Sequence, residues 1–202
     1  MSEEGSARDL LAEFEAAYAS TPPWDIGAPQ PAFAALAADG RLKGRVLDVG
    51  CGTGEHVLMA AEAGLDTTGI DISPTAIRLA EAKAGERQIR ARFVVGDAFE
   101  LGSLGEQFDT VLDCGLFHVF EDDDRRRFVA SLRSAMTSGG RYFMLCFSEE
   151  EPPGWGPRRV TQQEIREAFS DGWQVEGIEP AAIQVTVRPE PVRSWVSSIV
   201  RS

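Results

Sequence analysis

Between residues 45 and 148 the chain alternates short apolar runs with amphipathic stretches, and this alternation restricts the fold more than any other feature. Residues 45–50, 66–72, 91–97, 108–115 and 139–148 have the length and apolar content of buried strands. Residues 55–64, 73–84 and 123–136 have helical spacing, and Ser73 before Pro74 is a typical helix start. Strands that alternate with helices form parallel βαβ units, which predicts an α/β fold with helices on both faces of the sheet.

The two ends of the chain do not follow this alternation of apolar runs and amphipathic stretches. Leu10, Leu11, Phe14 and Tyr18 lie at helical spacing, and a proline-rich loop over 21–31 and a short helix through Phe33 follow. After residue 147 comes a loop without periodicity, then a helix over 161–172 and two alternating strands. We expect these last strands to form an antiparallel edge of the sheet.

Composition excludes several classes of protein. The 202 residues carry a net charge of −12, and the arginines are scattered, so a nucleic-acid substrate is not expected. No apolar run approaches the ~18 residues of a membrane span, and the acidic N-terminus is unlike a signal peptide, which predicts a cytoplasmic protein. Three cysteines suggest free thiols rather than disulfides, and no Cys or His pair has metal-ligand spacing, so no metal is expected.

The first predicted strand ends in a glycine turn, "VLDVGCGTG" at 46–54. Glycines at 50, 52 and 54 let a backbone approach a ligand closely, but they follow neither the dinucleotide pattern nor the P-loop pattern. Asp48 ends the strand, where a carboxylate repels a pyrophosphate and attracts an ammonium group. Asp48 could instead cap the turn.

Two further acids follow the next two strands. Asp71 lies in "GIDIS", about twenty residues downstream, where a carboxylate can accept both hydroxyls of a ribose. Asp97 lies in "VVGDA" and can accept a hydrogen bond from an adenine amino group, although it could also be a turn residue. Carboxylates at three strand ends suit an adenosyl compound with a cationic end.

At these motifs the chain resembles the class I S-adenosylmethionine-dependent methyltransferases. The resemblance implies a Rossmann-like seven-stranded sheet, mostly parallel with an antiparallel C-terminal edge strand, in a single domain. Residues 1–40 would be an N-terminal helical lid segment, 44–147 the cofactor-binding core, and 148–202 the substrate loop, helix and C-terminal strands. The cofactor-binding positions that the resemblance implies are Asp48, Gly50, Gly52, Asp71, Asp97 and Ala98, and we add the neighbouring or rim positions Trp24, Cys51, Ile72 and Asp113. Asp113 could instead simply end its strand.

The proline-rich loop around Trp24 is similar to that of the subgroup of thiol, halide and heterocycle methyltransferases. Trp24 could lie over the cofactor as a lid and face the sulfonium, or it could anchor the N-terminal helix on the sheet. The match is brief, and both roles stay open.

Candidate acceptor-binding residues follow the fourth and fifth strands: Trp24, Phe117, His118, Trp155 and Arg158. His118 is the candidate general base, with an orienting role as the alternative. Trp155 would form an apolar wall. Arg158 or Arg159 could bind an anionic substrate, or both could pair with Glu149–Glu151.

We therefore expect a methyltransferase that transfers a methyl group by in-line displacement to a small thiol, hydroxyl or heteroaromatic nitrogen, as a monomer or homodimer. The alternative is a non-catalytic S-adenosylmethionine-binding regulatory protein on the same fold.

Overall fold

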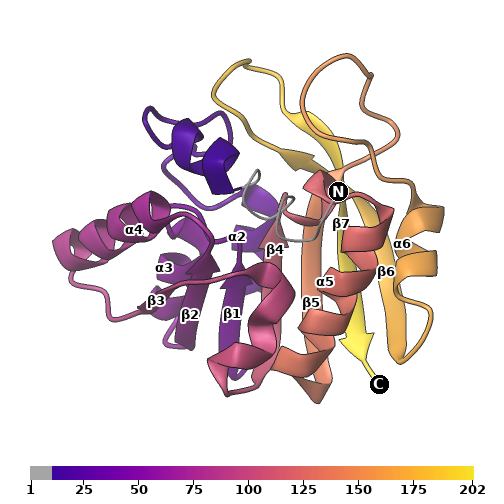
Figure 1. Cartoon of the computed structure of the whole chain (residues 1–202), viewed down its shortest axis with the longest axis horizontal. Helices are drawn as coiled ribbons and strands as arrows, with labels where there is room; N and C mark the ends of the chain where they lie inside the picture. Colours follow the sequence, from indigo (N-terminus) through magenta and orange to yellow (C-terminus); the bar gives the residue numbers. More distant parts are fainter. Residues whose placement is uncertain (1–10) are drawn as a thin grey trace.

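The computed structural model describes residues 11–202, and its centre is one seven-stranded sheet (Figure 1). The strands lie in the order β3-β2-β1-β4-β5-β7-β6. Pairs among β1 to β5 are parallel, whereas β7 is antiparallel to both of its neighbours. The strand bounds are β1 Arg45–Val49, β2 Asp66–Asp71, β3 Arg92–Val95, β4 Phe108–Cys114, β5 Met136–Phe147, β6 Trp173–Ile183 and β7 Val192–Arg201.

Helices cover both faces of the sheet, as predicted. One face of the sheet is covered by three helices, α2 (Pro31–Ala38), α3 (Glu55–Glu62) and α4 (Pro74–Arg87). The opposite face is covered by α5 (Asp122–Ala135) and α6 (Gln162–Ala168) (Figure 1). Short 3-10 helices η1 (Ala98–Leu104) and η2 (Phe117–Val119) follow β3 and β4. Residues 11–17 are helical, while the first part of this predicted helix, including Leu10, lies outside the described residues.

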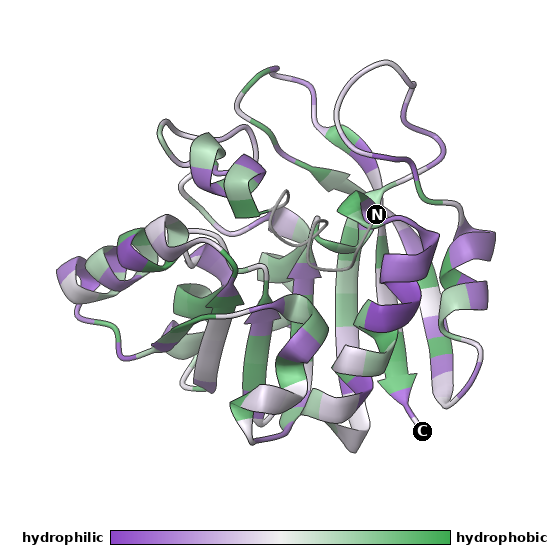
Figure 2. Cartoon of the chain, viewed as in Figure 1, coloured by the Kyte–Doolittle hydropathy of each residue, from purple (hydrophilic) through white to green (hydrophobic). Residues whose placement is uncertain are grey.

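Strand periodicity places the apolar residues of β5 alternately in two different cores. Along β5, Tyr142, Met144 and Cys146 pack toward α5, whereas Phe143 and Leu145 pack toward α2 and α3. Figure 2 shows the central strands as largely hydrophobic and the first turns of α5 as hydrophilic. Because alternate residues fill both cores, the sheet is held from both sides.

The C-terminal strands confirm the antiparallel edge and add a detail. β7 lies between β5 and β6, so β6 takes the edge position. β5 also starts earlier than the glycine pair predicts, since Met136 follows α5 directly and pairs with Phe108 before the register shifts. The shift places Gly140 near the Thr137 carbonyl, with only 2.8 Å available for a Cβ.

Strand order reverses between β1 and β4, and ligands of open α/β sheets bind at such a point, beyond the carboxyl ends of the strands. At this rim lie the residue 21–30 segment, the loop after β5 and the β6–β7 connection (Figure 1). The fold therefore brings distant parts of the chain to the predicted cofactor acids.

Candidate active site

A cavity of about 700 Å³ opens at this rim. Nine of the predicted site residues line it: Trp24, Gly50, Asp71, Ile72, Asp97, Ala98, His118, Trp155 and Arg158. Five others do not line it: Asp48, Cys51, Gly52, Asp113 and Phe117.

Asp48 is a buried carboxylate without a counter-charge in contact. Its side chain is 1% exposed, and neither oxygen has a hydrogen-bond partner among the described residues. The Nδ1 atom of His56 lies 3.8 Å from Oδ2. An unpaired buried carboxylate is costly, so this position suits a ligand that brings its own cation.

The turn after β1 depends on glycine backbone geometry. Gly50, Gly52 and Gly54 all have positive φ. A Cβ at Gly54 would stand 2.9 Å from both Ala80 and the ring of Phe93. The start of α3 can therefore lie against α4 and β3 only because Gly54 has no side chain.

Asp71 connects this turn to the next one. Its carboxylate accepts the backbone N–H groups of Gly52 at 2.8 Å and Ser73 at 2.9 Å. Burial raises the pKa of Asp71, and these two N–H groups oppose the rise. Each oxygen keeps a lone pair for another donor, such as a ribose hydroxyl.

Asp97 caps η1 through the backbone N–H of Phe99, at 2.8 Å from Oδ1. Ala98 and Phe99 follow it on the cavity wall. Phe99 packs on Phe120 with ring centroids 4.9 Å apart. This wall offers a flat apolar surface beside a carboxylate, which suits a purine ring.

The other residues of the turn support it from behind. The Cys51 side chain is buried with Val57 and Ile77 rather than facing the cavity. Gly52 acts through its backbone bond to Asp71.

Asp113 corrects a prediction, because it lies beneath the rim instead of facing the cofactor region. It is fully buried and accepts hydrogen bonds from the Tyr142 hydroxyl at 2.6 Å and from the backbone of Leu116 and Phe117. Burial raises its pKa to about 7 despite these donors. Asp113 therefore shapes the loop after β4.

Phe117 is also misplaced by the prediction. Its side chain is fully buried, packs on Phe169 at 5.8 Å and lies under the Arg125 guanidinium at 4.7 Å. The short η2 turn sends Phe117 into the core and leaves His118 on the cavity wall.

His118 is held in one tautomer. Its Nδ1 accepts the backbone N–H of Phe147 at 3.0 Å, so the neutral ring carries its proton on Nε2. Burial, assisted by Arg125 and Arg159, lowers the pKa of His118 to about 3. This histidine is therefore a hydrogen-bond donor at Nε2 near neutral pH, and its geometry favours the orienting role over the general base.

Trp24 lies between the cavity and the N-terminal helical segment. It lines the cavity, and its ring makes edge contacts with Phe14 at 6.0 Å and Tyr18 at 6.2 Å. Its Nε1 donates to the Tyr18 hydroxyl at 3.3 Å. Glu15 binds Ser73 and Thr75 at the start of α4, which ties this aromatic group to the core.

The loop after β5 supplies an aromatic wall. Trp155 lines the cavity and packs on Phe147 with ring centroids 5.5 Å apart. Arg159 donates to backbone carbonyls of the loop, including that of Trp155, and so holds the loop's shape.

Arg158 forms ion pairs with acidic residues other than Glu149–Glu151. It bonds Asp122 at 2.6 Å and also pairs with Glu164. Glu149 and Glu151 instead bind Trp195 and the backbone of Arg193. The predicted pairing with Glu149–Glu151 is therefore wrong for Arg158.

Further cavity residues were missed by sequence reasoning. Phe99, two positions after Asp97, could have been found from its place beside a predicted adenine ligand. Tyr18 and Gln30 belong to the predicted lid segment, and Leu116, Val119 and Phe120 flank the predicted His118. Only the fold reveals that the end of β6 and the connection after it also reach the cavity, through Ile183, Val185 and Val187.

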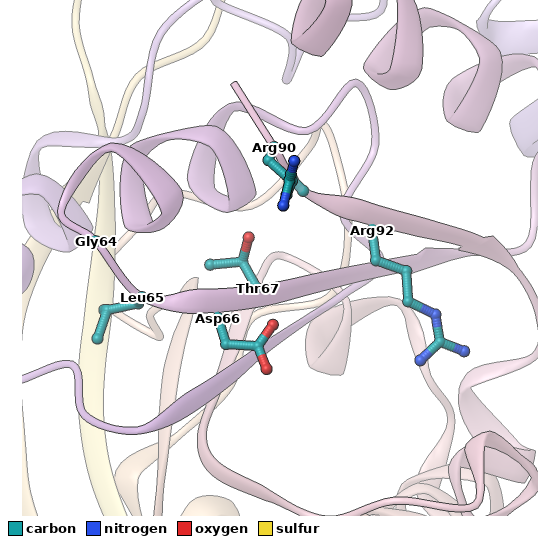
Figure 3. A pocket seen from close by; sticks show the side chains of 7 residues that line it. Gly64, Leu65, Asp66, Thr67, Arg90 and Arg92 are labelled. Carbon is teal, nitrogen blue, oxygen red and sulfur yellow. The ribbon is translucent and has the colours of Figure 1, made fainter. Parts of the chain in front are cut away.

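A second cavity, of about 490 Å³, lies where β2 and β3 begin, at the opposite end of the strands (Figure 3). Arg92 pairs with Glu106, and Asp66 lies 3.6 Å from Arg45.

Within residues 11–202, no group of three His, Cys, Asp or Glu side chains could hold a metal ion. In the same residues, no helix is long and apolar enough to span a membrane.

The comparisons agree with this geometry. The family model described as "Methyltransferase domain" matches residues 46–140. The chain is 38% identical to 2-heptyl-1-hydroxyquinolin-4(1H)-one methyltransferase of Mycobacteroides abscessus, over 82% of this chain and 74% of that protein. It is 32% identical to probable thiol methyltransferase 2 of Arabidopsis thaliana, over 75% and 68%.

Solved structures show the same fold. One comes from work on conversion of a disulfide bond into a thioacetal group during echinomycin biosynthesis, with 36% identity, a TM-score of 0.87 and coverage of 95% and 93%. Magnesium protoporphyrin IX methyltransferase of Synechocystis PCC 6803 with bound S-adenosylhomocysteine is 25% identical, with a TM-score of 0.66 and coverage of 85% and 80%. None of these findings supports the non-catalytic alternative.

Acids at successive strand ends, a buried carboxylate that lacks a cation, and extensive similarity to methyltransferases lead to one conclusion. The chain belongs to the class I S-adenosylmethionine-dependent methyltransferases and transfers methyl groups to small molecules.

Proposed function

We propose that the acceptor is a flat heteroaromatic compound whose nucleophilic oxygen or sulfur is already ionised near neutral pH. The observation that carries this proposal is the tautomer of His118, which offers a proton donor to the cavity and no free basic nitrogen. An acceptor that needs no base at this position fits such a site.

The cavity walls support a flat, apolar acceptor. Trp155 and Phe147 form one side, and Ile183 and Val185 come from the end of β6 and the connection after it. Arg158 is engaged by carboxylates. Stacking and apolar contact therefore supply most of the binding, and His118 Nε2–H can orient the nucleophilic atom.

We assign the cofactor to Asp48, Asp71 and Asp97, with Asp48 toward its ammonium group, Asp71 toward its ribose and Asp97 toward its adenine. Bound S-adenosylmethionine supplies an electrophilic methyl group on a sulfonium. The chain's part is to hold the acceptor in alignment and exclude water, and Trp24 with the residue 11–30 segment covers the cavity for that purpose. An anionic acceptor and a cationic donor yield two neutral products, so no proton has to leave.

One relative is named for a hydroxyquinolone, which is a flat heteroaromatic compound with a hydroxyl group, and another is named as a probable thiol methyltransferase. We also infer the division into a lid segment (1–40), a cofactor core (44–147) and an acceptor region (148–202). A cytoplasmic location, which the free cysteines of the described residues support, and a monomeric or homodimeric state complete the proposal.

The test uses a series of heteroaromatic acceptors that share one ring system and carry a hydroxyl or thiol group of different pKa. The control acceptor has the same ring system but carries its hydroxyl on an aliphatic side chain. Product is measured by mass spectrometry, and kcat/KM is measured from pH 5.5 to 9. We expect the rise in kcat/KM to follow each acceptor's own pKa and the aliphatic alcohol to be inactive. A single rise near pH 6.5, shared by all acceptors, would identify an enzymatic base instead and overturn the proposal.

A further inference from the structure

His56 links the two halves of the site, although it does not itself line the cavity. It is the second residue of α3, is 9% exposed, and packs edge-on against Phe33 with ring centroids 5.0 Å apart. The ring therefore has a defined position behind the glycine turn.

The hydrogen bond to one ring nitrogen defines the proton on the other. His56 Nε2 accepts the backbone N–H of Gln30 at 3.1 Å. The neutral ring then carries its proton on Nδ1, and Nδ1 lies 3.8 Å from Oδ2 of Asp48. This separation is longer than a hydrogen bond, but it places the imidazole N–H beside a carboxylate that has no hydrogen-bond partner among the described residues.

Gln30 carries the connection to the acceptor side. Its side chain donates to the carbonyl of Gln184 at 2.9 Å and accepts the Gln184 N–H at 2.8 Å. Gln184 follows β6 and lies between Ile183 and Val185 of the acceptor wall, and the Thr186 N–H bonds the Pro23 carbonyl at 2.9 Å. The lid segment and the β6–β7 connection are thus joined, and both meet His56 through Gln30.

We propose that His56 is a positioning residue that holds the Asp48 carboxylate toward the cofactor's ammonium group and, through Gln30, holds the lid against the acceptor wall. The inference rests on the assignment of Asp48 to that ammonium group. The two ring nitrogens of His56 have separate roles: Nδ1–H faces Asp48 on the cofactor side, and Nε2 accepts the backbone N–H of Gln30 in the lid segment.

Two substitutions separate these roles. In His56→Asn the amide nitrogen can replace Nδ1–H near Asp48, while the acceptor for Gln30 is lost. In His56→Gln the longer side chain can keep an acceptor near Gln30, while the donor near Asp48 is lost. Since each variant tests one role, a folding defect in one still leaves the other role measurable.

The readouts are calorimetric binding of S-adenosylhomocysteine and of 5′-methylthioadenosine, which lacks the amino-acid group, together with the KM of the acceptor. We expect His56→Gln to weaken S-adenosylhomocysteine about tenfold and leave 5′-methylthioadenosine unchanged. We expect His56→Asn to keep both affinities and raise the acceptor KM severalfold.

A purely structural histidine would change all three quantities together in both variants, or none of them, and either result overturns the inference. Asp48→Asn is the reference for the underlying assignment. If Asp48→Asn leaves the preference for S-adenosylhomocysteine over 5′-methylthioadenosine intact, the Asp48 assignment itself fails. If Asp48→Asn removes that preference and neither His56 variant changes it, only the role of His56 fails.

Discussion

At the scale of single residues, the site contains two kinds of buried polar group: those whose hydrogen bonds are satisfied within the protein, and those that have no partner there. Asp113 has three donors, and Asp48 has none among the described residues. The first arrangement stabilises a loop, whereas the second costs stability, and we propose that it serves the cofactor's ammonium group. Activity and stability should therefore respond in opposite directions at Asp48.

The substitution Asp48→Asn tests this opposition. We expect the free energy of unfolding without cofactor to rise by about 1–3 kcal/mol, because an unpaired buried charge is removed. Affinity for S-adenosylhomocysteine should fall at least about tenfold, since a charge-assisted contact is lost. Urea unfolding and calorimetry measure the two effects, and a fall in both stability and affinity would contradict this account.

His118 allows a similar separation. His118→Asn can keep an acceptor for the Phe147 N–H, and His118→Gln can keep a donor toward the cavity in place of Nε2–H. We expect His118→Gln to retain more kcat/KM than His118→Asn, which should lose about tenfold. The opposite order, measured with one acceptor at pH 7.5, would show that the donor is not what matters.

At the scale of elements, the turn between β1 and α3 decides whether the acids meet. Gly54 starts α3 with φ 87° and leaves no room for a Cβ. Gly64 ends the same helix region with φ 83° and has nothing within 4 Å of a Cβ. The two glycines share a backbone conformation and differ in their surroundings.

Replacing each glycine by alanine separates strain from crowding. Gly64→Ala should cost about 1–2 kcal/mol from the left-handed conformation alone. Gly54→Ala should cost at least about 1–3 kcal/mol more, because Ala80 and Phe93 must move, and cofactor binding should weaken with it. Equal losses in chemical denaturation would show that packing at Gly54 contributes nothing.

At the scale of the whole molecule, two buried groups give stability an opposed dependence on pH. The pKa of His118 is about 3 in the folded protein, and its ordinary value is 6.5. Between these values the unfolded chain binds a proton at His118, whereas the folded protein does not. Asp113 has a pKa of about 7 in the fold and an ordinary value of 3.8, so between these values the fold keeps a proton that the unfolded chain releases. Stability from His118 is lost as pH falls, and stability from Asp113 is lost as pH rises.

Comparison with His118→Asn isolates the first effect. The free energy of unfolding of the natural chain minus that of the variant should increase by up to about 1.4 kcal/mol per pH unit from pH 5 to 6.5 and stay level above. Urea unfolding at pH 5, 5.5, 6.5 and 7.5 measures it. A difference that does not change with pH would mean that His118 titrates normally.

The sequence by itself determined the alternating strands and helices, the glycine turn and the acids at or near the ends of β1, β2 and β3, because local patterns of period 2 and 3.6 and turn chemistry depend on neighbouring residues. Only the tertiary structure decided that Phe117 and Asp113 turn inward while His118 faces the cavity, that Arg158 pairs across to Asp122, and that β7 inserts between β5 and β6. Those outcomes depend on which distant groups meet across the sheet, and the tautomer of His118 in particular follows from one backbone N–H supplied by β5.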